Sequence, residues 1–208
     1  MLSRQHLEVL TVLAVFTAVG IQQARLREKV QREQQSRCAA GLPIEELLGI
    51  AKSFSSDLEI TSLIQKITTK ARDLLDAEGC SLFLRDRRAD ELWTIVADGT
   101  QEIRFPMTLG IAGHVAETGE VLNISDVSTD ARFDPKIDQP AGLQTKSILC
   151  LPLFEDENTI ISVIQILNKV DGPFVDQDEE LMNAFSALAA VAIRNALLFQ
   201  RTLERRDD

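Results

Sequence analysis

The sequence predicts an α+β domain in which a central antiparallel sheet has its N- and C-terminal helices packed on one face. Apolar residues recur with the period of a helix at both ends of the region 44–203. Between these ends the apolar period changes to two, in short segments separated by turn residues. The chain has 208 residues, of which 45% are hydrophobic, so it is long enough for one domain and an extension.

Three helices are expected at the two ends of this domain. The first follows Pro43, which suits an opening helical turn, and its apolar face consists of Ile44, Leu47, Leu48 and Ala51. The second begins near Thr61 and ends near Gly79, which suits a left-handed cap. Its apolar stripe consists of Leu63, Ile64, Ile67, Ala71, Leu74 and Leu75. The last is one long helix over 176–203.

Short strands and one short helix are expected in the middle of the domain. The strands are 80–85, 92–96, 103–105, 121–124, 147–153 and 160–167. A short helix begins at Gly110 and ends at Gly119. The segment 125–146 is long and polar, and a loop of this length inside a compact domain is usually functional.

Residues 1–37 form a basic leader ahead of an acidic domain. They carry a net charge of +3, whereas residues 38–208 carry −13. The uncharged run 9–24 is short for a membrane span and lacks a clear cleavage site. The leader also has the alternating three- and four-residue spacing of a coiled coil, at Val9, Val12, Phe16, Val19, Gln23, Leu26 and Val30. We expect a helix that dimerises the chain or contacts a membrane through 9–24, followed by a linker, 38–43; the tail is 204–208.

Composition excludes several classes of function. The net charge of −10 argues against a nucleic-acid partner, which needs clustered cations. Cys38, Cys80 and Cys150 have no metal-ligand spacing, and we expect them to be free thiols in a reducing compartment. His114, the one histidine after the leader, is expected to be structural. We therefore expect no metal, no cofactor and no enzymatic activity.

Three segments together resemble GAF domains: 80–84 (CSLFL), 110–116 (GIAGHVA) and 122–127 (LNISDV). A further set is similar to the NKFDE motif of cyclic-nucleotide-binding GAF domains, found in mammalian phosphodiesterases and some cyanobacterial adenylate cyclases. It consists of Asn168, Lys169, Phe174, Asp178 and Glu179. The resemblance covers about residues 44–203. It implies that Lys169 and Asp178 form a buried bridge that braces the domain without touching a nucleotide.

The segment that begins at Gly110 has the properties of an anion site. The first N–H groups of a helix lack partners and lie at the positive end of its dipole. Gly110 and Gly113 are expected to let the backbone come close to a bound group. The resemblance implies that the backbone N–H groups of Ile111 and Ala112 hold the phosphate of a cyclic nucleotide.

The same resemblance implies further positions that line the nucleotide pocket: Ser81, Asp98, Asp138, Ala141, Thr145 and Gln165. Asp98 slightly favours cGMP over cAMP as the ligand, because a carboxylate accepts hydrogen bonds and guanine offers N1–H and an amino group as donors. Ala141 and Gln165 stand where cGMP-binding relatives have a threonine and a glutamate, which weakens that preference. The choice between cGMP and cAMP therefore stays open.

The sequence matches known classes of enzyme less well than it matches a binding domain. The sequence lacks HExxH, a phosphate-binding GK[ST] loop and GxSxG. Among GAF relatives, phytochromes attach a bilin through cysteine, and free methionine sulfoxide reductases use clustered loop cysteines. The 125–146 loop contains no cysteine. We expect a cytoplasmic-facing sensor whose loop closes on a cyclic nucleotide and biases the flanking helices, within a homodimer. The alternative is a ligand-free dimerisation scaffold.

Overall fold

The computed structural model describes residues 44–95, 102–140 and 142–207. These belong to one compact unit, 42–208. The predictions made for the leader 1–37, the linker 38–43, Asp98 and Ala141 lie outside the described residues. The α+β class is confirmed.

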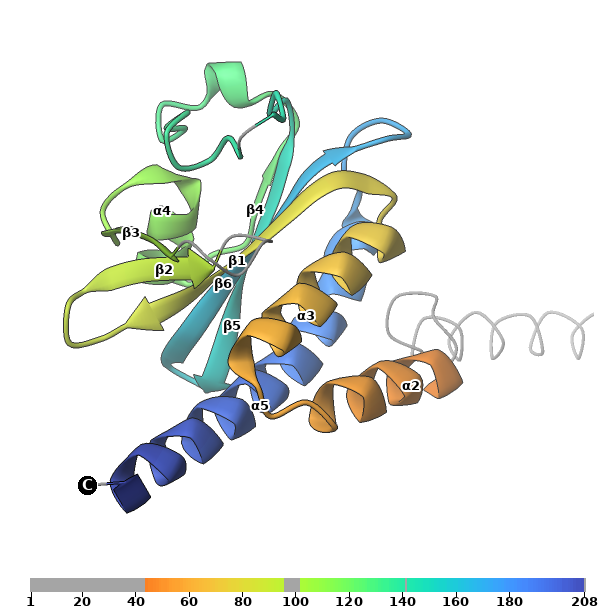
Figure 1. The fold of residues 1–208 in the computed structure, drawn as a ribbon. Helices are drawn as coiled ribbons and strands as arrows, with labels where there is room; N and C mark the ends of the chain where they lie inside the picture. Colours follow the sequence, from red (N-terminus) through yellow and green to blue (C-terminus); the bar gives the residue numbers. More distant parts are fainter. Residues whose placement is uncertain (1–43, 96–101, 141, 208) are drawn as a thin grey trace, which may run out of the picture. The chain divides into compact units, whose positions relative to one another are not determined.

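One antiparallel sheet forms the centre of the fold, with its six described strands in the order β3-β2-β1-β6-β5-β4 (Figure 1). β6 is buried along almost its whole length and β5 along its first six residues, because each face of the sheet is covered by another layer there. The edge strands β3 and β4 are short, which limits the exposed ladder. The bounds are β1 (Ala77–Asp86), β2 (Glu91–Ile95), β3 (Glu102–Pro106), β4 (Leu122–Ile124), β5 (Ile148–Asp156) and β6 (Thr159–Lys169).

The terminal helices cover one face of the sheet, as expected. They are α2 (Ile44–Ser55), α3 (Ile60–Leu74) and α5 (Asp176–Asp207). α3 and α5 contact the sheet directly, whereas α2 packs mainly on α5 (Figure 1). Phe54 of α2 and Phe185 of α5 meet edge to face, with ring centroids 5.6 Å apart.

Among the described residues, α5 has one stretch, Asp176–Leu203, that is long and apolar enough to cross a membrane. An 18-residue window within this stretch has a mean hydropathy of 1.5, and half of that window is buried inside the domain. The core helix of a globular domain has the same properties, so this stretch is weak evidence for a span.

The opposite face of the sheet carries α4 (Gly110–Thr118) and the loop 125–146, which includes the 3-10 turn η2 (Val127–Thr129) (Figure 1). An apolar cluster fills the space between α4 and the sheet, and Phe83 packs edge to face on Phe105 there, with centroids 5.2 Å apart. Gly119 ends α4 in the left-handed conformation, with φ of 74°. This end of α4 is therefore as the sequence predicts.

Two expected helix ends were wrong. α3 ends at Leu74, and Asp76 takes the left-handed conformation (φ 48°) that we assigned to Gly79. The reason is pairing: β1 already pairs with β6 from Ala77, so the chain must turn three residues earlier. α5 continues to Asp207, past the expected end at residue 203, because no glycine or proline interrupts the sequence there.

Candidate ligand-binding site

The N-terminus of α4 is capped by a side chain from a distant loop. Leu109, which precedes the helix, makes no side-chain cap hydrogen bond. Instead the N–H of Ile111 donates to both carboxylate oxygens of Asp138, each at 3.1 Å. Gly110 has φ of +73°, and a Cβ on it would lie 3.0 Å from the Asp138 carboxylate. A glycine here therefore permits the close approach of an anionic group.

Asp138 is fully buried and is held by N–H donors from three parts of the chain. Besides Ile111, the backbone N–H of Asp134 donates at 2.9 Å and the Gln165 side chain at 3.0 Å. The N–H of Ala112 also contributes. Burial raises the pKa of Asp138 above its ordinary value, while these donors oppose that rise. Each of these four donors favours the ionised carboxylate.

The sequence Asp134-Pro135 folds the loop back toward α4. The side chain of Asp134 accepts a hydrogen bond from the N–H of Lys136 at 2.9 Å, as in an Asx turn. Its carbonyl accepts from the N–H of Asp138 at 2.8 Å. The hydroxyl of Thr145 then donates to the Asp138 carbonyl at 2.9 Å, which ties the middle of the loop to its C-terminal end. The loop is thereby built to present one carboxylate to α4.

The structure brings most of the predicted pocket residues together. Ile111, Asp138, Thr145 and Gln165 form one buried, hydrogen-bonded cluster, with Ala112 beside it. Ser81 of β1 is the register partner of Gln165 on β6, so the two side chains share the α4 face of the sheet. Asp98 and Ala141 lie outside the described residues.

Two features of this site were not expected from the sequence. The N–H of Ile111, which we assigned to a ligand phosphate, donates to Asp138 in this structure. Gly113 is needed for packing, because a Cβ there would lie 2.3 Å from the carbonyl oxygen of Met107. This glycine allows α4 to pack against the preceding turn. Sequence reasoning also missed Asp134, although the Asp-Pro pair is a recognisable turn signal.

Asn168 anchors the other end of the loop to the sheet. Its side-chain oxygen accepts from the backbone N–H groups of Lys146 and Ser147, at 2.7 and 3.2 Å. Its amide nitrogen donates to the carbonyl of Gln144 and to the Glu78 carboxylate, both at 2.7 Å. Asn168 has φ of 55°, a conformation that asparagine tolerates better than most residues.

The remaining motif residues join the end of β6 to the start of α5. The Lys169 ammonium lies 2.6 Å from the Asp178 carboxylate, with side-chain exposures of 19% and 11%. Asp178 also accepts from the N–H of Val175 at 2.8 Å. Asn123 of β4 donates to the Glu179 carboxylate and to the carbonyl of the buried Phe174. The motif residues thus connect β4, β6, α5 and the loop end to one another.

A sequence model of the GAF domain family matches residues 59–193, which is more than half of the chain. The chain belongs to the GAF domain family. Its matched region includes the α4 face of the sheet, the loop and most of α5.

Curated relatives of this GAF domain are much longer proteins. A probable 3′,5′-cyclic phosphodiesterase pde-5 of Caenorhabditis elegans is 36% identical over an alignment of 170 residues, which covers 74% of this chain and 23% of the relative. A dual 3′,5′-cyclic-AMP and -GMP phosphodiesterase 11A of Takifugu rubripes is 35% identical over an alignment of 178 residues, which covers 78% of this chain and 20% of the relative. The chain therefore spans about a fifth to a quarter of the length of these relatives.

Solved structures share the GAF fold at low sequence identity. The GAF domain of an Acinetobacter phosphoenolpyruvate-protein phosphotransferase has a TM-score of 0.64 at 18% identity, over 74% of this chain and 94% of that chain. A free methionine-R-sulfoxide reductase of Neisseria meningitidis has 0.59 at 16%, over 73% and 88%. At these identities the likeness shows the fold alone.

The Lys169–Asp178 pair provides a test of how this GAF domain is braced. We expect Lys169→Met to lower the free energy of unfolding by about 2 kcal/mol, because it leaves a largely buried carboxylate without its cation. The matched control is Lys70→Met, which breaks a half-exposed pair with Glu46 at 3.4 Å and is expected to cost less than about 0.5 kcal/mol. Urea unfolding measures both; equal costs would contradict the bracing role.

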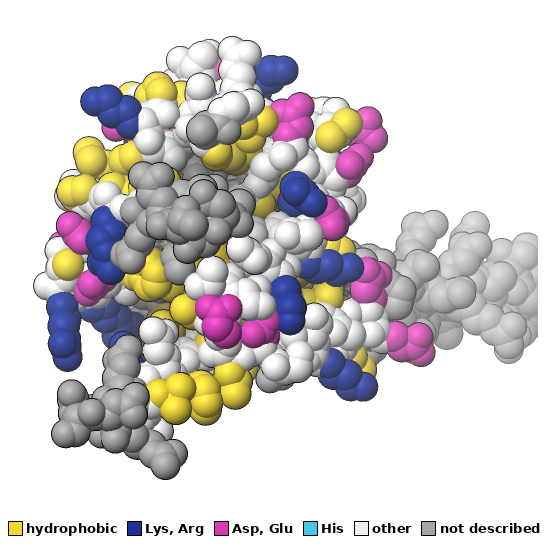
Figure 2. Space-filling view, viewed as in Figure 1, with side chains coloured by type: hydrophobic (Ala, Val, Ile, Leu, Met, Phe, Trp, Pro, Cys, Tyr) yellow, Lys and Arg dark blue, Asp and Glu magenta, His cyan; other side chains and the backbone are white. Residues whose placement is uncertain are grey.

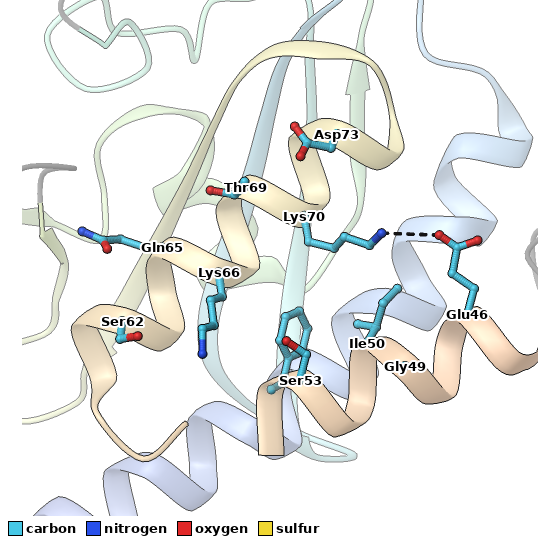
Figure 3. Close-up of a pocket in the computed structure, with 11 residues that line it drawn as sticks. Glu46, Gly49, Ile50, Ser53, Ser62, Gln65, Lys66, Thr69, Lys70 and Asp73 are labelled. Atoms are coloured by element: carbon cyan, nitrogen blue, oxygen red, sulfur yellow. Dashed lines mark hydrogen bonds and ion pairs between the residues drawn. The ribbon is translucent and has the colours of Figure 1, made fainter. Parts of the chain in front are cut away.

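Two grooves lie outside the cluster around Asp138. One, of about 670 Å³, runs between α2 and α3, where Figure 3 shows Lys70 reaching across to Glu46. The other, of about 450 Å³, adjoins β4 and the start of the loop. There Arg132 donates to Asp130 at 2.6 and 2.9 Å, and with a small contribution from His114 these bonds lower the pKa of Asp130 to about 2. Neither groove is lined by a predicted nucleotide residue.

Of the two thiols among the described residues, that of Cys150 is buried and that of Cys80 is half-buried. Cys80 and Cys150 are free, and burial raises the pKa of each thiol above its ordinary value. We expect both to resist alkylation by iodoacetamide at pH 8 in the folded chain and to react fully in urea. Mass spectrometry of the peptides measures this; rapid native labelling of Cys150 would contradict the buried position.

Proposed function

We propose that this GAF domain is a non-catalytic regulatory module that binds a cyclic nucleotide, in a protein exposed to the cytoplasm. The observation that carries the proposal is the set of backbone N–H groups, from Ile111 and Ala112 at the α4 N-terminus and from Asp134 in the loop, which converge on one anionic group. A cyclic phosphate carries a single negative charge, as a carboxylate does, and suits a helix N-terminus. The names of the two curated relatives, both cyclic-nucleotide phosphodiesterases, support this choice.

The rest of the cluster supplies groups for a ribose and a base. Ser81, Thr145 and Gln165 offer hydroxyl and amide groups on the sheet side of the loop. Asp98 would accept hydrogen bonds from guanine, and on this ground cGMP is slightly favoured over cAMP. No cofactor or metal is part of the proposal.

The signal would travel through contacts that connect the loop to α5. Asn168 holds the loop end, and its neighbour Lys169 holds the first turn of α5 through Asp178. Ordering of the loop by a ligand would therefore bias the position of α5 relative to the sheet. The change in the position of α5 would then act on a partner protein or on the second copy in a dimer.

Homodimerisation is also a proposal. Three residues near the end of α5 are exposed and apolar, Leu198, Phe199 and Leu203, and Figure 2 shows hydrophobic side chains gathered over that part of the helix. We also propose that the leader 1–37 pairs with a second copy of itself, or touches a membrane through 9–24. We propose no nucleic-acid partner.

Thermal unfolding of the chain with cGMP, with cAMP and with neither tests the proposed ligand. Linkage predicts about 2.7 kcal/mol of added stability at a free ligand concentration one hundred times the dissociation constant. A rise with one nucleotide would support sensing and identify the purine. No shift at millimolar concentrations of either would contradict the proposal.

The alternative, a ligand-free dimerisation scaffold, has one observation in its favour. Asp138, Thr145 and Gln165 are buried and bond to one another, so the described part of the cluster is filled by its own side chains. The stability of a scaffold would not change when a cyclic nucleotide is added. A variant that cannot dimerise would lose the scaffold function.

A further inference from the structure

The Asp138 carboxylate takes up the donors that the proposed function assigns to a ligand phosphate. Its two oxygens accept from the N–H of Ile111 at 3.1 Å, and one of them accepts from the N–H of Asp134 at 2.9 Å. The donors come from two separate elements, α4 and the loop, so a single anion closes the space between them.

A second anion cannot share this place. Asp138 is fully buried, and its described hydrogen bonds come from neutral N–H groups rather than from a cation. Two like charges within hydrogen-bond distance of the same donors repel strongly where water is excluded. A phosphate that reaches Ile111 must therefore move the carboxylate away.

We propose that Asp138 is an internal substitute for the ligand phosphate, which holds the loop on α4 in the unliganded domain and is displaced when a phosphate-bearing ligand binds. The identity of that ligand rests on the proposed function. Displacement releases Gln165 and loosens the tie between Thr145 and the Asp138 carbonyl. Binding and loop movement are then one event, and the measured affinity is reduced by the work of removing Asp138.

The test compares anion binding by the full chain and by Asp138→Ala. The first probe is inorganic phosphate, followed by the amide resonances of Ile111 and Asp134. We expect the variant to bind it about tenfold more tightly than the unchanged chain, since the donors are left without their anion. The control, Asp130→Asn, removes the same charge from the same loop, but its carboxylate pairs with Arg132; it should show no gain.

A second variant covers the case in which Asp138→Ala does not fold. Thr145→Val removes the hydroxyl that donates to the Asp138 carbonyl and should weaken the hold on the carboxylate, with a gain of a few-fold for inorganic phosphate. If neither variant that folds gains affinity, or if the control gains equally, the inference is wrong.

Binding measurements with cGMP and cAMP then distinguish a failure of this inference from a failure of the proposed function. If the unchanged chain binds cGMP or cAMP while inorganic phosphate binds no better to Asp138→Ala, the function stands and the displacement is refuted. If phosphate binding improves in Asp138→Ala but neither nucleotide binds the unchanged chain or the variant, the internal substitute stands and the proposed ligand is wrong.

Discussion

Gly113→Ala is expected to lower the free energy of unfolding by about 3 kcal/mol. The added Cβ would lie 2.3 Å from the carbonyl oxygen of Met107, which is backbone and cannot rotate away. α4 would have to shift away from the turn at 107–109, and its N-terminus would move with it. Urea unfolding gives the cost, and we expect any binding at the α4 N-terminus to weaken as well.

Gly49→Ala is the matched control for this change. Gly49 lies inside α2, and a Cβ on it would meet nothing within 4 Å. Alanine is the better helix former, so this variant should gain about 0.5–1 kcal/mol. If Gly113→Ala instead matched this gain, the close packing of α4 on Met107 would be refuted.

Asn168→Ala is expected to lower the free energy of unfolding by about 3 kcal/mol, as much as Gly113→Ala. The change leaves the N–H of the buried Ser147 without its side-chain acceptor and removes the bonds to Gln144 and Glu78. It also puts alanine at φ 55°. Urea unfolding and the hydrogen exchange of residues 142–147 measure the loss of the anchor.

Asn168→Gly separates the two causes in the asparagine variant. Glycine tolerates the left-handed backbone but makes none of the side-chain bonds. It should therefore remain destabilised and should expose the loop end to exchange as fully as alanine does. Recovery of most of the stability in the glycine variant would mean that backbone strain, rather than the anchor, dominates the effect.

The sequence predicts the layers of this fold well because its periodicity is strong there. The apolar run that forms β6 and the helical stripe of α5 are unambiguous, and Gly119 is a clear helix end. The wrong helix end at Gly79 has a tertiary cause. Pairing of Ala77 with Lys169 decides where β1 begins, and no local pattern reveals a partner 92 residues away.

The candidate site was only partly predictable. Resemblance pointed to Ile111, Asp138, Thr145 and Gln165, which do lie together. It did not indicate that Asp138 would cap α4 itself, because a capping carboxylate 27 residues from the helix gives no local sequence signal. The packing role of Gly113 was not predictable for a similar reason, since its neighbour Met107 is defined only by the packing of α4.

The most direct test of this account follows the backbone amides of Ile111 and Asp134 by NMR while the chain is titrated with cGMP or cAMP, and with the matching nucleoside, which lacks the phosphate. The account predicts that one cyclic nucleotide shifts both resonances together, as the carboxylate of Asp138 is exchanged for a phosphate, and that the nucleoside leaves them nearly unchanged. Binding of a cyclic nucleotide with both resonances unmoved would contradict the assignment of the α4 N-terminus as the phosphate site.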